Sequence, residues 1–353
     1  MNTKFIIYTM LLFIGCSFNK DNQLELALKY AGENRQELEK VLEHYKNDPE
    51  KLSATYFLIK NMIGKQVIDS NSIKNMQPFY NALTNHVEKY GRYKNDVQYL
   101  ICDSIKQLFP NTTAYPQYQS DIRKLSSGYI IHHIDECFNI WRQYPWCKDI
   151  DTETFHKYIL PYTTSNYHWE QTLDFFSQKY ALLRDTAQNK SYMEVDELIS
   201  HDIDTTFLKE WGIYAEEYKG LLPTTFQNIV SAQMGSCLEY NIYKIAALRA
   251  NGIPAVLNAH TGWGNFGYTH FWTEIIDDKP IKKLYDNTQR PYVSNDDILV
   301  SDMFWNNTYN PAIKDISPLI SINYCRTVPK VYRFNYEIQK ENLALVAHEE
   351  IPS

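Results

Sequence analysis

The stretch that decides the fold of this 353-residue chain is residues 234–255, which read MGSCLEYNIYKIAALRANGIPA. Apolar residues recur in it at spacings of three and four, which predicts a helix over 237–251. Gly252 is expected to end this helix in a left-handed conformation, and Pro254 lies just beyond it. The helix therefore begins directly at a cysteine, Cys237.

The residues after this helix read as extended chain rather than as further helix. Five segments are rich in β-branched and aromatic residues or apolar runs: 255–259, 269–276, 281–285, 316–327 and 331–336. The composition of residues 277–280, Asp-Asp-Lys-Pro, predicts a turn that joins two of them into an antiparallel hairpin. Helices followed by a cysteine-bearing helix and an antiparallel sheet predict an α+β fold.

Cys237 has the surroundings of a reactive thiol. A helix N-terminus carries a partial positive charge and free N–H groups, and both stabilise a thiolate. We therefore expect the pKa of Cys237 to be lowered, which would make it a nucleophile. Gly235 allows a tight turn before the helix and close approach of a substrate.

A nucleophilic thiolate needs a proton-transfer partner, and His270 is the best candidate in the sequence. Histidine titrates near neutral pH, and His270 begins a predicted strand after a glycine-rich loop. In the predicted hairpin, position 270 faces position 286 or 287 of the next strand. Asp286 is therefore expected to orient the imidazole, with Asn287 as the alternative.

These motifs together resemble the transglutaminase-like superfamily, whose core is related to papain. The resemblance lies in four segments in the same order: Gly235-Ser236-Cys237, the exit Leu248-Arg249-Ala250-Asn251-Gly252-Ile253-Pro254-Ala255, the strand His270-Phe271-Trp272, and Leu284-Tyr285-Asp286. It covers about residues 222–290, and a Tyr stands at 285 where the family commonly has Trp. The resemblance implies a nucleophile helix packed on an antiparallel sheet.

The family also implies roles for individual residues. Cys237 would be the nucleophile, His270 the general base and acid, and Asp286 the orienting residue. The oxyanion hole would combine the Cys237 backbone N–H with a side-chain donor, for which Gln233 and Gln227 are the candidates. Trp263 and Trp272 are candidates for lining the cleft. The implied reaction is acyl transfer from amides of peptides or glycopeptides through a thioester, with hydrolysis favoured over cross-linking, and it needs no cofactor.

The N-terminal half is predicted to be mostly helical. Apolar periodicity and breakers indicate helices over these segments: 23–45, 49–63, 71–90, 95–109, 121–141, and 152–184 with a break at 160–161. Asp48 is expected to cap the second helix, which Pro49 opens. The predicted organisation is a signal peptide over 1–15, a tether over 16–22, a helical region over 23–200, a transglutaminase-like core over 201–300, and an extended segment over 301–353 that packs on the core.

The first residues read as a lipoprotein signal. Lys4 precedes an apolar run that is too short to span a bilayer and that ends at Gly15-Cys16. This ending resembles a bacterial lipobox, in which Cys16 takes the lipid. The alternative is a plain cleaved signal, and both place the protein outside the cytoplasm. A Ser at position 17 rather than Asp favours the outer membrane, on its periplasmic or surface face.

Composition restricts the remaining possibilities. The net charge is −7 and Lys and Arg form no cluster, so a nucleic-acid partner is not expected. Cys102, Cys137, Cys147 and Cys325 are left after lipid and catalysis are assigned; Cys137–Cys147 is the disulfide we would choose, with buried free thiols as the alternative. No metal site is expected, because the adjacent His132 and His133 face different ways on a helix.

A second function stays open at this point. The 28 tyrosines suit a cleft that binds peptide or glycan, since each combines a large ring with a polar tip. The chain would then be a catalytically idle envelope lipoprotein that uses the same cleft for binding. The presence of all three triad residues favours the enzyme.

Overall fold

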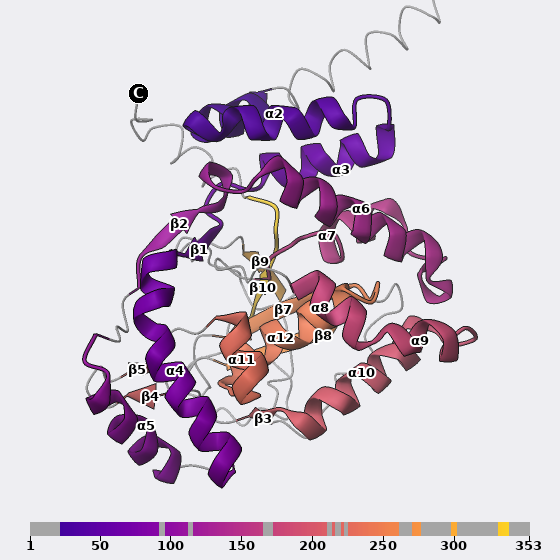
Figure 1. Cartoon of the computed structure of the whole chain (residues 1–353). Helices are drawn as coiled ribbons and strands as arrows, with labels where there is room; N and C mark the ends of the chain where they lie inside the picture. Colours follow the sequence, from indigo (N-terminus) through magenta and orange to yellow (C-terminus); the bar gives the residue numbers. More distant parts are fainter. Residues whose placement is uncertain are drawn as a thin grey trace, which may run out of the picture.

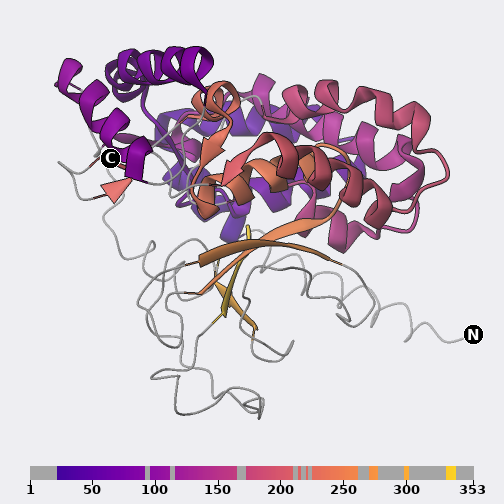
Figure 2. The ribbon, with the colours of Figure 1, turned by 90° about the horizontal axis from the view of Figure 1, so that it is seen from below.

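The computed structural model describes residues 22–91, 96–111, 116–164, 172–209, 214–215, 220–221, 225–260, 270–276, 298–301 and 331–338. After a helical segment over 22–30, the α-helices are α2 (Arg35–His44), α3 (Pro49–Lys60), α4 (Ser70–Tyr90), α5 (Asp96–Leu108), α6 (Ser127–Gln143), α7 (Thr152–Tyr158), α8 (Thr172–Lys179), α9 (Ala181–Thr186), α10 (Tyr192–Thr206), α11 (Phe226–Ala232) and α12 (Cys237–Arg249). The described chain is thus α+β and mostly helical, and these helices lie on one side of a small sheet (Figure 1, Figure 2).

The strands form one four-stranded sheet and three two-stranded ones. They are β1 (Gln66–Ile68), β2 (Tyr118–Ser120), β3 (Leu208–Lys209), β4 (Tyr214–Ala215), β5 (Gly220–Leu221), β6 (Met234–Gly235), β7 (Ala255–His260), β8 (His270–Ile275), β9 (Ile298–Ser301) and β10 (Val331–Phe334). The larger sheet has the order β8-β7-β10-β9. The small pairs are β1 with β2, β3 with β6, and β4 with β5.

Most predicted N-terminal helices are present, but three predicted segments differ from the structure. In the segment expected over 152–184, α7 ends at Tyr158 before the predicted break, and α8 and α9 are separate helices. The expected helix over 23–45 is divided by a 3-10 turn, Gly32–Asn34, because Gly32 has a φ of 58° that no regular helix accommodates. The expected helix over 121–141 begins only at Ser127, where the Ser126 side chain caps it. Asp48 caps α3 as predicted, since its carboxylate accepts the Lys51 N–H at 3.2 Å.

The sheet corrects the prediction of a purely antiparallel arrangement. Strand β7 runs antiparallel to both of its neighbours, β8 and β10, with His260 opposite His270 and Ala259 opposite Phe271. Strand β10 pairs with β9 in parallel, from Val331 opposite Ile298. Strand β10, from the C-terminal segment, lies between β7 and β9, so the sheet is mixed rather than purely antiparallel. The proposed hairpin over 269–285 has its second strand outside the described residues.

One hydrophobic core runs through most of the described chain. It contains helix residues such as Leu38 and Phe138, α12 residues such as Leu248, and sheet residues such as Leu257 and Phe334. The expected boundary at residue 200 falls within α10 and within this core. A smaller cluster, which includes Met76, Phe79, Tyr80, Leu83 and Cys102, joins α4 to α5.

The C-terminal segment links the sheet to the first helices. The Tyr336 hydroxyl donates to the Leu58 carbonyl at 3.2 Å, and the Ile338 N–H donates to Asn61 Oδ1 at 3.1 Å. The buried Lys65 ammonium donates to the Tyr336 carbonyl at 2.8 Å and lies 4.4 Å from the centroid of its ring. Residues 331–338 thus contact the first helices, and they also supply strand β10 beside β7.

The predicted Cys137–Cys147 disulfide is wrong. Both cysteines are buried free thiols, as is Cys102. Cys137 lies in the middle of α6, where its Sγ is 3.5 Å from His133 Nε2. Cys147 instead donates to the Gly252 carbonyl at 3.3 Å. The alternative of buried free thiols therefore holds for these three residues, and Cys325 lies outside the described residues.

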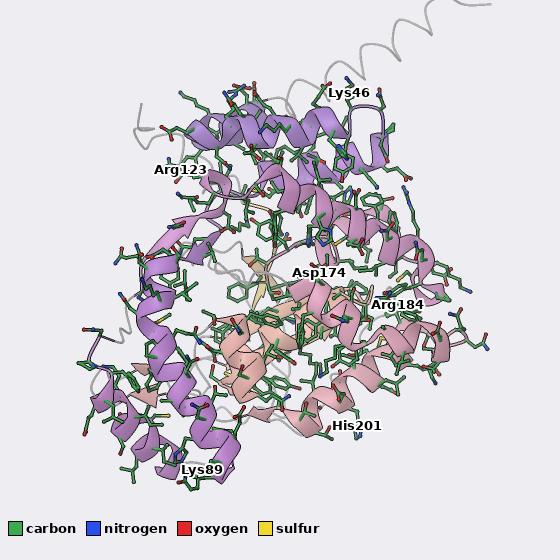
Figure 3. All side chains as sticks on the ribbon, in the orientation of Figure 1. Lys46, Lys89, Arg123, Asp174, Arg184 and His201 are labelled. Carbon is green, nitrogen blue, oxygen red and sulfur yellow. The ribbon has the colours of Figure 1, made fainter. Side chains whose placement is uncertain are left out.

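The labelled basic side chains of Lys46, Lys89, Arg123 and Arg184 lie on separate parts of the molecule rather than on one face (Figure 3). Within the ranges that the structure describes, no helix combines the length and the apolar character needed to cross a bilayer.

Candidate functional site

The N-terminus of α12 is fixed by a capping box. Ser236 is the N-cap, and its Oγ accepts the Leu238 N–H at 3.2 Å. In the reciprocal half of the capping box, the Glu239 carboxylate accepts the Ser236 N–H at 2.9 Å. It also accepts a hydrogen bond from the Ser236 hydroxyl. Cys237 is therefore the first residue of the helix, as the sequence predicts, and the first turn of the helix is held in place.

The chain before Cys237 approaches the helix closely. A Cβ on Gly235 would lie 2.7 Å from Glu239 Cβ and 3.3 Å from the Phe207 ring, so glycine is required there. Two residues earlier, Gln233 has a φ of 47°, the only positive φ among the described non-glycine residues. A left-handed glutamine costs conformational energy, and such strain is common at functional sites. Gln233 also ends α11, with its N–H donating to the Ile229 carbonyl at 2.7 Å.

The thiol of Cys237 lies beside strand β8. Helix α12 packs against β8 and β7, and the backbone N–H of Phe271 hydrogen-bonds the sulfur. Phe271 is the residue directly after His270, so the sulfur lies next to the peptide bond that joins these two residues. The structure therefore brings together the backbones of the two residues that the sequence proposed as nucleophile and base.

The pKa of Cys237 differs in direction from the sequence-based expectation. Burial raises the pKa of this half-buried thiol, and the charge of Glu239 acts in the same direction. Hydrogen bonds from the backbone N–H groups of Phe271, Leu238 and Cys237 itself lower it. The helix terminus supplies the expected donors, but loss of solvent around the sulfur outweighs them.

The structure describes only some of the other predicted site residues. His270 is the first residue of β8 and pairs with His260, while its side chain lies outside what the structure describes. Trp272 is 6% exposed within the sheet, so it is a buried residue here rather than an open cleft wall. Gln227 is exposed on α11. Asp286, Asn287, Trp263 and Cys16 lie outside the described residues.

Asn241 and Thr273 form part of this site, although the sequence analysis did not select them. Asn241 Nδ2 donates to the Cys237 carbonyl at 2.7 Å and to the Phe271 carbonyl at 2.9 Å. Its Oδ1 accepts the Thr273 hydroxyl at 2.7 Å. The available signal was a polar residue one helical turn after Cys237, on the same face of the helix.

Arg249 fixes the other end of the nucleophile helix. It is buried, and its guanidinium donates to the carbonyls of Ala255 at 3.0 Å, Thr163 at 3.0 Å and Pro161 at 3.3 Å. Burial lowers its pKa to about 9. Gly252 has a φ of 74°, which confirms the predicted left-handed residue after the helix. This end of α12 is thus joined to the start of β7.

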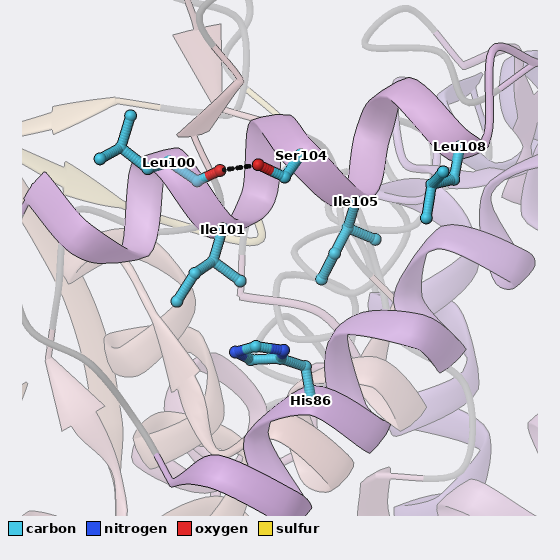
Figure 4. Close-up of a pocket in the computed structure, with 6 residues that line it drawn as sticks. All are labelled: His86, Leu100, Ile101, Ser104, Ile105 and Leu108. Atoms are coloured by element: carbon cyan, nitrogen blue, oxygen red, sulfur yellow. Dashed lines mark hydrogen bonds between the residues drawn. The ribbon is translucent and has the colours of Figure 1, made fainter.

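A pocket elsewhere in the molecule contains none of these residues. It has a volume of about 390 Å³ and lies between α4 and α5 (Figure 4). Its lining consists of His86, Leu100, Ile101, Ser104, Ile105 and Leu108. Four of these six residues are apolar, and the Ser104 hydroxyl already donates to the Leu100 carbonyl at 2.7 Å.

The two adjacent histidines of α6 have separate partners. His132 pairs with Asp174 at 2.8 Å, and His133 bonds the Leu160 carbonyl at 2.7 Å. Among the residues with described side chains, no cluster of His, Cys, Asp and Glu could hold a metal ion.

Comparison of the chain with protein families, with curated proteins and with solved structures gave no match.

Proposed function

We propose that this protein is a cysteine-dependent acyltransferase of the transglutaminase-like kind that acts on amide bonds of peptides or glycopeptides. Cys237 is the nucleophile, His270 is the general base and acid, and Asp286 orients the imidazole. The observation that carries the proposal is the position of the Cys237 sulfur at the Phe271 N–H, one residue from His270.

The proposed reaction has two stages. The Cys237 thiolate attacks the amide carbonyl carbon, and His270 delivers the thiol proton to the departing amine as the C–N bond breaks. A thioester remains on the enzyme. Water then attacks the thioester with His270 as base, which releases a carboxylic acid and restores the thiol. We favour water over an amine as the second nucleophile, so the enzyme would be a protease or amidase.

Polar donors near Cys237 fit this chemistry. The N–H of Cys237 and the Gln233 side chain are the proposed donors to the oxyanion that forms during attack. A paired imidazolium at His270 would oppose the effect of burial on the thiol, because a neighbouring positive charge stabilises a thiolate. The raised pKa found around Cys237 therefore makes the His270 partner necessary for activity at neutral pH.

The test is the pH dependence of Cys237 alkylation in the folded protein. Wild type and His270→Ala are treated with iodoacetamide from pH 5 to 10, and labelling of each cysteine peptide is quantified by mass spectrometry. We expect rapid labelling of Cys237 with an apparent pKa well below about 8.5, and loss of this low-pH labelling in the variant.

The buried thiols supply the internal control. Burial raises the pKa of Cys102 and of Cys147 to about 12, so neither should label before the protein unfolds. Labelling of Cys237 with an ordinary thiol profile in both proteins would refute the catalytic pair. A positive result leads to a screen of peptide amides, with hydroxylamine used to trap the thioester.

A catalytically idle binding lipoprotein is the second candidate. The raised pKa of Cys237 favours it, since an unactivated thiol does not attack amides. In that case Cys237→Ala would leave the binding of peptides or glycans unchanged, and no amide would be turned over.

We also propose that Cys16 carries lipid and holds the protein on the cell envelope, at the outer membrane. The support is the apolar run that ends at Gly15-Cys16. Metabolic labelling with an alkyne fatty acid should mark the wild type and spare Cys16→Ala, which should also leave the membrane fraction. Equal labelling of both proteins would contradict the lipid anchor.

A further inference from the structure

Strand β8 lies at the edge of the described four-stranded sheet, and helix α12 covers part of that edge. An exposed strand edge presents unpaired backbone N–H and C=O groups. At Phe271 the structure satisfies both groups from the helix, since the Phe271 N–H bonds the Cys237 thiol and the Phe271 carbonyl accepts from Asn241. The contact between helix and strand is therefore made by specific hydrogen bonds as well as by packing.

Asn241 uses its whole amide in this contact. It is 6% exposed, and its two donor bonds and one acceptor bond join the Cys237 carbonyl, the Phe271 carbonyl and the Thr273 hydroxyl. Asparagine is a poor residue for a helix interior, because its side chain competes for backbone hydrogen bonds. Its presence in α12 is explained by the strand that it holds rather than by the helix that it occupies.

We infer that Asn241 is the positioning residue of the Cys237 site. It links the carbonyl of Cys237 to the strand residue that follows His270, and so it sets the separation and register of the two backbones that carry nucleophile and base. This inference rests on the proposed function, because it assigns Asn241 a role in the pairing of Cys237 with His270. Thr273 acts through Asn241 by fixing the orientation of the amide.

Asn251 provides a matched control. It lies two residues beyond the same helix, it is fully buried, and its Nδ2 donates to the carbonyl four residues earlier, Ala247, at 2.8 Å. Its amide thus makes the same local bond that Asn241 makes to Cys237, and its described hydrogen bonds, which include those to Ala247 and Trp146, join no residue of β8. Loss of either amide should destabilise the protein, but only loss of Asn241 should change the chemistry of Cys237.

The experiment compares Asn241→Leu with Asn251→Leu, by thermal unfolding and by the pH profile of Cys237 alkylation. We expect both variants to melt earlier than wild type. In Asn241→Leu alone, the apparent pKa of Cys237 should rise by about 1 unit, which lowers labelling at pH 7 by about tenfold. Thr273→Val should shift the profile in the same direction by less, and Thr273→Ser, which keeps the hydroxyl, should restore the wild-type profile.

Each other outcome decides against the inference. A wild-type profile in Asn241→Leu, or the same shift in Asn251→Leu, would reduce Asn241 to a packing role. If Asn241→Leu does not fold, identical profiles in Thr273→Val and Thr273→Ser would overturn the role. If wild-type Cys237 itself labels as an ordinary thiol, unaffected by His270→Ala, the proposed function fails and the positioning role fails with it. Failure of the proposed function is therefore detected in the wild type and in His270→Ala, before any Asn241 variant is made.

Discussion

The cysteines of helices α6 and α12 lie in opposite settings: the α6 cysteine has a histidine on its own helix, and the α12 cysteine lies beside strand β8, which His270 begins. In α6, Cys137 lies in the middle of the helix, fully buried, with its sulfur 3.5 Å from His133. In α12, Cys237 opens the helix, is half-buried, and touches the strand that begins with His270. Proximity of the two residue types is therefore not enough to identify a reactive pair.

The difference lies in what surrounds the two side chains. Burial raises the pKa of Cys137 far above that of an ordinary thiol and lowers the pKa of His133 to about 4, so both groups are neutral near pH 7. Cys237 has three backbone N–H groups that favour its thiolate and a position at a helix terminus. A helix start gives a cysteine donors that the middle of a helix has already used.

The largest effect that we expect concerns His133. An unfolded histidine titrates near pH 6.5, and its folded pKa of about 4 means that only the unfolded chain takes up a proton between these values. The contribution of the neutral His133 to the free energy of unfolding is therefore fully present above pH 6.5. It is lost as the pH falls toward 4, and the loss amounts to about 3 kcal/mol. This loss is measured by urea unfolding of wild type and of His133→Gln between pH 4 and pH 6.5.

The variant cannot take up this proton, so its stability should depend less on pH. Equal slopes in the two proteins would mean that His133 is charged in the folded state. His133 would then take up its proton in the folded protein as readily as in the unfolded chain, and the contrast with the Cys237 site would weaken.

A medium effect is expected from one glycine at the start of each of the two helices. Gly235→Ala places a Cβ 2.7 Å from Glu239 Cβ, and such overpacking costs about 1–3 kcal/mol. Gly128→Ala in α6 meets only Ser126 Oγ at 3.9 Å and should stabilise the helix by about 0.5–1 kcal/mol. Thermal unfolding separates the two, and only Gly235→Ala should also slow Cys237 alkylation. Equal stability changes would show that the chain before Cys237 can relax.

The smallest effect is expected from the two N-cap serines. Ser126 accepts the Tyr129 N–H at 3.2 Å, and Ser236 accepts the Leu238 N–H at the same distance. Replacement of either serine by alanine should cost about 1 kcal/mol in urea unfolding. Alkylation at pH 7 should fall for Cys237 in Ser236→Ala and stay unchanged in Ser126→Ala. A fall in both variants would indicate a global rather than a local effect.

The sequence predicted elements whose signals are local. Apolar periodicity and Gly252 gave α12 to within two residues at its end, and Asp48 with Pro49 gave the start of α3. The break at Gly32 was missed because the apolar spacing continues across it, and only the positive φ interrupts the helix. The strands β7 and β8 were predicted from composition alone.

Features that depend on distant residues were not predictable in this way. The parallel pairing of β10 with β9 requires knowledge of which strand the C-terminal segment joins, and no local pattern records it. The false Cys137–Cys147 pair came from their closeness in sequence, whereas each thiol has its own partner in the fold. For the candidate site, the position of Cys237 was predictable, while the role of Asn241 depends on strand residues thirty positions later.

The entry of residues 331–338 into the molecule has a consequence for the order of folding. Strand β7 lacks one of its neighbours, and the Leu58 and Asn61 partners of the C-terminal segment stay unbonded, until these residues have been synthesised. Contacts between residues almost three hundred positions apart close slowly, because the entropy of a long loop must be overcome first. A growing chain of this protein therefore cannot complete this part of the fold before residues 331–338 have been made and have left the ribosome.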